Sequence, residues 1–201
     1  MPPTPRSPTH YPPNEYIQTA QTGNKVSRRS TILGSQNIIL GGKCIIQNGV
    51  IIRGDLKRSQ PPSQTQAVVI YIGRYCTLAE GCIVRPPYKT YKGIFSYYPV
   101  KIGDHVTIGS GTITEAASIG SHVEIGRNCV IGRFSIIKDS VKILDNTVIA
   151  PNTVISSSSV FAGCPGKEVE GVELEETWSE NLEKVNKAFY LGFRPLTSNP
   201  S

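Results

Sequence analysis

The sequence has 201 residues, of which 38 % are hydrophobic and 18 % are charged, and its formal net charge is +6. This composition predicts one folded domain with tails, and the scattered Lys and Arg residues argue against a nucleic-acid-binding protein. No run reaches the roughly 20 apolar residues that span a membrane, and the first residues lack the apolar core of a signal peptide. We therefore expect a cytosolic protein that does not insert into membranes.

The chain begins with a proline-rich stretch. Residues 1–13 contain six prolines and no apolar run. Because proline favours extended backbone that packs poorly, this composition predicts a flexible arm. The folded domain is then expected to span residues 14–166.

Residues 119–154 repeat every six positions. Each hexad opens with isoleucine and carries a small or β-branched residue four places later. A period of six fits neither a helix of 3.6 residues per turn nor a hairpin sheet, but it is typical of a hexapeptide β-helix, in which three hexads form one triangular coil. The isoleucines predicted to face the core are Ile119, Ile125, Ile131, Ile137, Ile143 and Ile149.

The same register extends towards the N-terminus as far as Leu40, which gives about six coils. We therefore predict an all-β fold, a left-handed parallel β-helix, followed by one C-terminal α-helix. The left hand is taken from the resemblance to known hexapeptide helices, since crossover connections are otherwise right-handed. Four cysteines occupy the small inward slot of a hexad and are predicted to be buried free thiols: Cys44, Cys76, Cys82 and Cys129.

Two insertions interrupt the coils, at residues 57–67 and 86–99. The first is polar and proline-bearing, and we expect a flexible excursion there. The second holds four tyrosines and one phenylalanine, which predicts either a contact surface for a protein partner or a loop that folds over its own prism. Together with one helix residue, the candidate partner-binding residues are Arg85, Tyr88, Tyr91, Phe95, Tyr97, Tyr98 and Trp178.

The C-terminal segment, residues 167–201, is predicted to contain a helix at about residues 178–191. Thr177 and Glu180 have the spacing of a capping box at its start. Four apolar residues lie on one face of this helix, which should pack on the prism or, alternatively, dock onto another chain. They are Trp178, Leu182, Val185 and Phe189.

Two enzyme classes share hexapeptide helices. Gamma-class carbonic anhydrases bind zinc through three histidines, and residues 38–56 resemble the opening coil of that family. Ser110, Glu115 and Arg85 stand at or near the places of those ligands, so we predict no metal site. Hexapeptide acyltransferases use a histidine base, and a surface histidine leaves that alternative open, although no partner carboxylate or acceptor-binding insertion is recognisable. We expect no catalytic residue and no cofactor.

His105 and His122 have a defined geometric relation. Both are fourth in their hexads and lie 17 residues apart, one shortened coil. They should therefore stack on neighbouring coils, roughly 5 Å apart. We expect a paired surface ladder, with a metal-binding or pH-sensitive site as the alternative.

Several segments resemble the dynactin subunit 5 family, in order, from about Asn14 to Thr197. They are GNKVSR (23–28), GSQNI (34–38), IIRGDL (51–56), VRPPYK (84–89), IGDHV (102–106), KILDNTV (142–148), VFAGCPG (160–166) and PLT (195–197). The arm at residues 1–13 and the insertion at 57–67 depart from this resemblance and look like additions.

The resemblance implies a non-enzymatic adaptor in the pointed-end complex of dynactin, the cofactor of cytoplasmic dynein. The expected partners are dynactin subunit 6, dynactin subunit 4 and an actin-related protein, and indirectly dynein and its cargo adaptors. It further implies a role in capping the actin-related filament and in moving membrane cargo, such as early endosomes, along microtubules. The expected location is the cytoplasm and the cytoskeleton.

Overall fold

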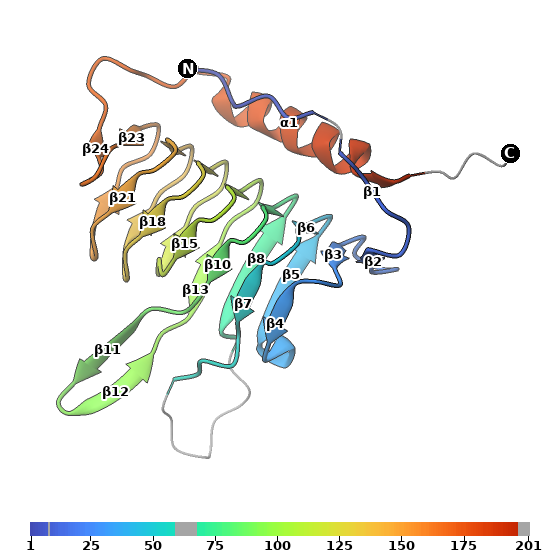
Figure 1. The fold of residues 1–201 in the computed structure, drawn as a ribbon. Coiled ribbons are helices and arrows are strands. Elements are labelled where there is room, and N and C mark those ends of the chain that lie inside the picture. Colours follow the sequence, from blue (N-terminus) through green and yellow to red (C-terminus); the bar gives the residue numbers. More distant parts are fainter. Residues whose placement is uncertain (8, 59–67, 197–201) are drawn as a thin grey trace, which may run out of the picture.

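A computed structural model describes residues 1–7, 9–58 and 68–196 of the chain. The hexads form a three-sided prism whose walls are mostly parallel sheets, built from the short strands of successive coils (Figure 1). Within these residues two walls have six strands each and the third has nine. The predicted all-β, left-handed parallel β-helix of about six coils is confirmed. Most of the 57–67 insertion lies outside the described residues.

The three walls are named here by their outer surfaces. The helix wall lies beneath the C-terminal helix and contains β2 (Tyr16–Gln18), β3 (Lys25–Ser27), β6 (Ile45–Ile46), β9 (Thr77–Leu78), β14 (Thr107–Ile108), β17 (Glu124–Ile125), β20 (Lys142–Ile143), β23 (Val160–Ala162) and β24 (Lys167–Glu168). The aliphatic wall contains β4 (Thr31–Leu33), β7 (Ile51–Arg53), β10 (Ile83–Val84), β15 (Ile113–Thr114), β18 (Val130–Ile131) and β21 (Val148–Ile149). The mixed wall contains β5 (Ile38–Gly42), which follows a 3-10 turn at Ser35–Asn37, β8 (Ile70–Arg74), β13 (Val100–Ile102), β16 (Ser118–Ile119), β19 (Ile136–Ile137) and β22 (Val154–Ile155).

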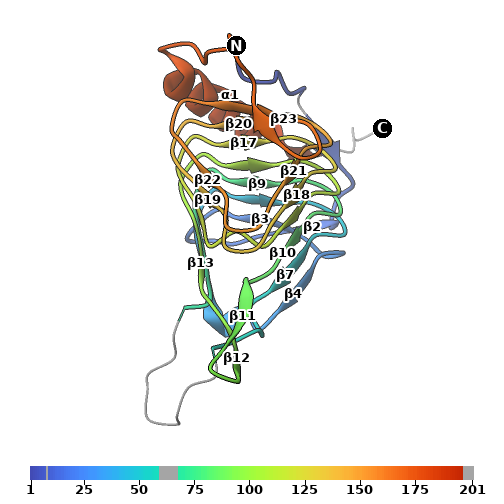
Figure 2. The same cartoon turned by 90° about the vertical axis from the view of Figure 1, so that its left-hand side faces the viewer.

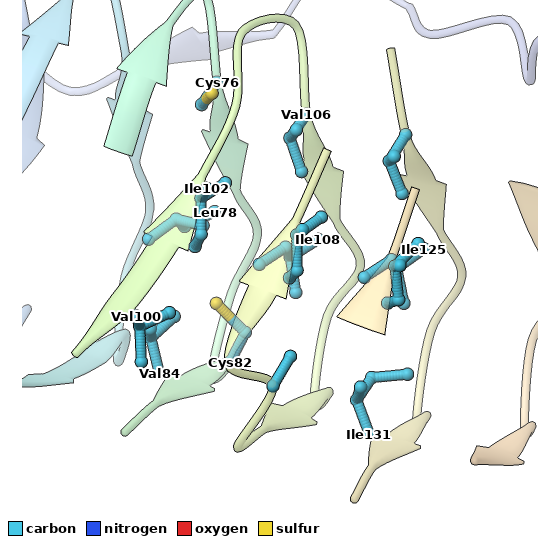
Figure 3. Close-up of a cluster of buried hydrophobic side chains, with 14 of the residues drawn as sticks. Cys76, Leu78, Cys82, Val84, Val100, Ile102, Val106, Ile108, Ile125 and Ile131 are labelled. Atoms are coloured by element: carbon cyan, nitrogen blue, oxygen red, sulfur yellow. The ribbon is translucent and has the colours of Figure 1, made fainter. Parts of the chain in front are cut away.

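Aliphatic side chains fill the interior of the prism in layers. The six isoleucines that open the hexads of residues 119–154 are each at most 1 % exposed. Figure 3 shows how neighbouring coils stack Leu78, Ile102 and Ile108, with the thiols of Cys76 and Cys82 among them. The four cysteines in the inward slots are free and buried. Each buried aliphatic side chain contributes about 1.5–3 kcal/mol, so the stability of the protein resides in this interior.

The corners of the prism impose a special backbone. The fourth residue of most hexads has a positive φ, for example +57° at His105 and +58° at His122. Glycine at the second position of a hexad serves close approach between coils, because a Cβ on Gly103 would lie 2.7 Å from the carbonyl carbon of Gly120 in the next coil. Each wall strand and the corner after it take six residues, and because every corner needs this special backbone, the sequence repeats with a period of six.

Helix α1 (Trp178–Gly192) lies along the helix wall, as Figure 1 shows from the side and Figure 2 shows along the stack of coils. It is one residue longer than predicted, and the predicted capping box is wrong. Thr177 is the N-cap residue but its side chain makes no capping bond. Its hydroxyl instead accepts a hydrogen bond from the side-chain amide of Asn181 at 3.0 Å, which competes for the same oxygen.

The buried face of α1 is partly polar. Asn186 and Tyr190 are buried on it, whereas Val185 is only half-buried. The Asn186 side chain donates to the carbonyl of His105 at 3.0 Å, and the indole of Trp178 donates to the carbonyl of His122 at 2.9 Å. The helix therefore packs on its own prism, the first of the two alternatives above. No helix within the described ranges is long and apolar enough to cross a bilayer.

The proline-rich segment, predicted as a flexible arm, instead lies along the helix wall beside α1 (Figures 1 and 2). Its strand β1 (His10–Tyr11) pairs in parallel with β25 (Arg194–Pro195) beyond the helix. Tyr11 is 8 % exposed and its ring lies 4.8 Å from that of Phe193. The Lys142 ammonium donates to the carbonyl of Pro2 at 3.0 Å. Buried polar groups of the wall need partners, and the arm supplies them.

Candidate partner-binding site

The aromatic insertion forms a β-hairpin that projects from one corner of the prism (Figures 1 and 2). Its strands β11 (Tyr88–Tyr91) and β12 (Ile94–Tyr97) are antiparallel and pair Tyr88 with Tyr97 and Tyr91 with Ile94. The turn residues Lys92 and Gly93 both have positive φ, +48° and +75°, as a two-residue hairpin turn requires. The alternating pattern within this insertion was not assigned to strands from the sequence.

The base of the hairpin is closed by the prism. The Tyr98 amide donates to the carbonyl of Pro87 at 2.9 Å, so the chain leaves and re-enters the wall at one point. The ring of Tyr98 packs 5.3 Å from that of Phe134, which occupies a corner position in a later coil. The base is therefore fixed, whereas the tip extends into solvent.

Three aromatic side chains cluster along one face of the hairpin. Ring centroids are 5.4 Å apart for Tyr88 and Phe95, and 5.1 Å apart for Phe95 and Tyr97. Tyr91 and Ile94, the pair at the tip, are 62 % and 64 % exposed. Tyr98 therefore folds onto the prism, as the second alternative drawn from the sequence expects, whereas the tip stands free of it; the contact surface of the first alternative stays a prediction.

Cations lie over these rings. Lys89 is 4.9 Å from the ring of Tyr98, and Arg133 is 5.1 Å from that of Tyr88. Arg58 and Lys92 make similar contacts, with Tyr98 at 5.5 Å and Tyr91 at 5.5 Å. The sequence reading missed Lys89, Ile94, Arg133 and Phe134. Arg133 and Phe134 could have been found from the sequence, because they are the third and fourth residues of the hexad IGRFSI and so lie at an outward-facing corner.

Two of the predicted site residues behave differently. Arg85 forms an ion pair with Glu115, one coil further along the aliphatic wall. Trp178 is not part of this surface: it is the first residue of α1, on another wall, and it is 2 % exposed because its indole is buried against the prism. Its assignment as a partner-binding residue was wrong. The structure brings together Tyr88, Phe95 and Tyr97, with Tyr91 at the tip and Tyr98 and Arg85 at the base.

The positions of the carbonic anhydrase ligands carry other chemistry. Arg85 and Glu115 form an ion pair. Ser110 precedes strand β15 and Glu115 follows it, so the two lie at opposite edges of the aliphatic wall, and Ser110 lines a cavity. Among the residues that the structure describes, no group of three His, Cys, Asp or Glu side chains could hold a metal ion. This arrangement does not fit a three-histidine zinc site.

The two histidines stack as predicted. Their ring centroids are 5.4 Å apart and the planes differ by 5°. Tyr75 extends the stack at 5.2 Å from His105, and Glu183 of α1 accepts from His122 at 3.1 Å. His105 is 8 % exposed and its burial lowers its pKa. The hydrogen bonds from Lys187 and then from His122 lower the pKa of Glu183 to about 2. The ladder fastens α1 to the prism.

A cavity of about 730 Å³ opens beside the arm on the helix wall. Arg6, Thr107, Glu124 and Lys142 line it together with Phe189. Lys142 Nζ and Glu124 Oε2 form a buried ion pair at 3.7 Å. The same carboxylate oxygen accepts a hydrogen bond from the backbone amide of Thr4 at 3.1 Å. Glu124 and Lys142 therefore hold the arm against this wall.

Comparison with known proteins gives one family. Residues 8–199 match the family model described as dynactin subunit 5. A dynactin subunit 5 from Dictyostelium discoideum is 43 % identical over 114 residues, which cover 57 % of this chain and 52 % of that protein. The matched region therefore spans about half the length of that relative.

Solved structures share the fold. A hexapeptide transferase family protein from Anaplasma phagocytophilum has a TM-score of 0.57 and 17 % sequence identity, and the match covers 88 % of this chain and 94 % of that one. An N-acyltransferase from Bacillus cereus, in complex with dTDP and coenzyme A, has a TM-score of 0.59 and 13 % identity, covering 82 % and 88 %. At such identities the likeness extends to the fold alone.

Proposed function

This chain belongs to the dynactin subunit 5 family, and from that premise we propose that it is a non-enzymatic structural subunit of dynactin. The observation that carries the proposal is the family match over residues 8–199. A stiff prism with a projecting hairpin suits a subunit that positions other proteins. The absence of a metal-ligand cluster among the described residues is compatible with such a role.

Within dynactin we place the subunit in the pointed-end complex, with dynactin subunit 6, dynactin subunit 4 and an actin-related protein as its neighbours. In that position it would help to cap the actin-related filament. It would also help to couple cytoplasmic dynein, through cargo adaptors, to membrane cargo such as early endosomes. Its location would be the dynein–dynactin complexes on microtubules. These details follow from the family resemblance.

The competing reading is a hexapeptide enzyme, of the carbonic anhydrase or the acyltransferase type. Against the first, Arg85 and Glu115 are paired where zinc ligands would be required. For the second, no partner carboxylate was recognisable in the sequence, but Glu183 accepts a hydrogen bond from His122, and a carboxylate in this place orients a histidine base. His105 is stacked between Tyr75 and His122. Stoichiometric zinc in the purified protein together with hydration of carbon dioxide would reverse this ranking.

The hairpin is the surface that we assign to a partner. Its exposed tip pair, Tyr91 and Ile94, offers apolar area that the prism does not need for folding. The experiment expresses a Tyr91→Ser, Ile94→Ser variant with an affinity tag in cells of the source species and measures co-purifying dynactin subunits by mass spectrometry. Selective loss of one or more subunits is expected.

The matched control is Leu191→Ser, which removes a side chain of similar exposure, 58 %, from α1. It should leave the set of co-purified subunits unchanged. Both variants should keep the circular dichroism spectrum of the parent protein. If no dynactin subunit accompanies the parent protein itself, the proposed function is wrong; if the tip variant retains them all, the assignment of the hairpin is wrong.

A further inference from the structure

The hairpin carries charge of one sign. Residues 85–101 contain Arg85, Lys89, Lys92 and Lys101 and no acidic residue. Strand β10, which leads into the hairpin, pairs with β7 and β15, and the carboxylates that follow these strands, Asp55 and Glu115, are already paired with Arg53 and Arg85. The local field of the hairpin is therefore positive, more so than the modest net charge of the whole chain indicates.

Four cations form what we call the cationic hairpin surface: Arg58, Lys89, Lys92 and Arg133. In the described parts of the chain none of the four forms an ion pair with a carboxylate. Each lies 4.9–5.5 Å from an aromatic ring instead. A ring holds a cation in place without neutralising it, so the positive charge stays available to an anionic partner.

Strand β11 has an edge to offer. Within the described ranges it pairs with β12 and with no other strand, so the backbone groups along its other edge are not used in a sheet. A two-stranded hairpin is marginally stable, and an added third strand supplies main-chain hydrogen bonds and buries side chains. The edge thus fits an extended peptide.

The chemistry of this edge selects among possible peptides. Lysines on an exposed edge discourage pairing with neutral or basic strands, which protects against aggregation. The same lysines attract a strand that carries carboxylates. Protection alone accounts for Lys89 and Lys92 on the hairpin itself. It does not account for Arg133, which a different coil of the prism brings over Tyr88.

We propose, resting on the partner-binding role assigned above to the hairpin, that the edge of β11 binds an extended, acidic segment of a partner protein. Carboxylates of the segment would contact Lys89, Lys92 and Arg133. Its backbone would pair with Tyr88–Tyr91, the range of β11. Interleaved side chains of the segment would pack on the aromatic rings.

The experiment uses three fluorescein-labelled decapeptides and the full chain. The first alternates glutamate with threonine, the second alternates lysine with threonine, and the third alternates glutamate with proline. Fluorescence anisotropy is recorded at 50 mM and 200 mM salt. The glutamate–threonine peptide should bind, and its affinity should fall severalfold at the higher salt. The lysine peptide should not bind. The proline peptide, which cannot add to an edge, should bind at least tenfold more weakly.

Charge reversal locates the site. A Lys89→Glu, Lys92→Glu, Arg133→Glu variant should lose at least tenfold in affinity for the glutamate–threonine peptide and gain affinity for the lysine–threonine peptide. The matched control, Lys138→Glu, Lys167→Glu, Lys184→Glu, changes the net charge equally at exposed positions on other elements and should bind as the parent does. A second variant replaces residues 88–97 by two glycines across the closed base and should not bind.

Three outcomes would overturn the inference. They are equal loss in the control variant, equal binding of the proline peptide, and binding only to vesicles of phosphatidylserine and phosphatidylcholine, which are tested in parallel. Co-purification of dynactin subunits is measured on the same charge-reversal variant. If the parent chain co-purifies with dynactin subunits but never binds the glutamate–threonine peptide, the acidic segment alone is refuted. If the parent chain co-purifies with no dynactin subunit, the proposed function on which the inference rests is refuted.

Discussion

The helix wall and the aliphatic wall are built from the same hexads, yet their outward side chains differ. On the helix wall the paired strands align Lys25, Ile45, Thr77, Thr107, Glu124, Lys142 and Val160; all seven are buried and five of them are polar. On the aliphatic wall Thr31 is followed by five aliphatic outward positions: Ile51, Ile83, Ile113, Val130 and Val148. Among the described residues, α1 and the arm cover the helix wall, and no helix or strand covers the aliphatic wall.

Polar groups explain what covers the helix wall. The Lys25 ammonium donates to the carbonyls of Tyr190 and Phe193 at 2.7 and 2.6 Å, where α1 ends. Lys142 and Glu124 hold the arm at Pro2 and Thr4. Directional bonds of this kind fix where the covering elements sit, whereas the aliphatic ladder is stabilised by its own neighbours along the wall.

The largest effect is expected in the shared interior. Ile125→Asp places a charge beneath the helix wall, and Ile131→Asp places one beneath the aliphatic wall, at positions 0–1 % exposed. An unpaired buried carboxylate should destabilise either variant by more than roughly 4 kcal/mol and abolish cooperative melting in circular dichroism. Val130→Asp, next to Ile131 but 42 % exposed, is the control and should melt nearly as the parent does.

The covered wall should depend on single polar groups. Lys25→Met keeps the length of the side chain but leaves two buried carbonyls without their donor. We expect a loss of about 2–3 kcal/mol in urea unfolding, with faster hydrogen exchange in α1. Ile51→Met on the aliphatic wall should cost much less. Similar losses at both positions would show that the two walls do not differ in this way.

A smaller effect concerns acid. Burial lowers the pKa of His105, so this imidazole is protonated at a lower pH in the native state than in the unfolded state, where it is protonated near pH 6.5. Stability attributable to this group is complete above that pH and is lost as the pH falls below it. His105→Tyr copies Tyr75 of the preceding coil and should flatten the pH dependence of urea unfolding between pH 7 and 5. An unchanged slope would mean that other groups dominate.

The smallest effect is expected at the hairpin. Replacing residues 88–97 by two glycines should leave the melting temperature within a few degrees of the parent, since Pro87 and Tyr98 already close the base. Most of the removed side chains are exposed or pack on one another. A large loss of stability would show that the hairpin belongs to the folding core after all.

The interior was predictable because the corner geometry repeats in the sequence. Because isoleucine recurs at every sixth residue, the sequence indicates which side chains face the core. The stacking of His105 on His122 follows from the same six-residue period, since both are fourth in their hexads. The covering elements were harder. Proline composition suggested a mobile arm, but the groups that hold it, Glu124 and Lys142, are more than a hundred residues away. Trp178 was misassigned because hydrophobicity does not tell a covered wall from an exposed one.

The positive-φ corners have a further consequence. Because each such residue points away from the interior, its identity is uncoupled from the packing that maintains the column. Lys43, Tyr75, His105 and Ser140 all occupy this conformation along the chain. Each edge of the prism is thus a line of outward side chains at nearly constant pitch, so an element that lies along an edge can be held at several successive coils at once.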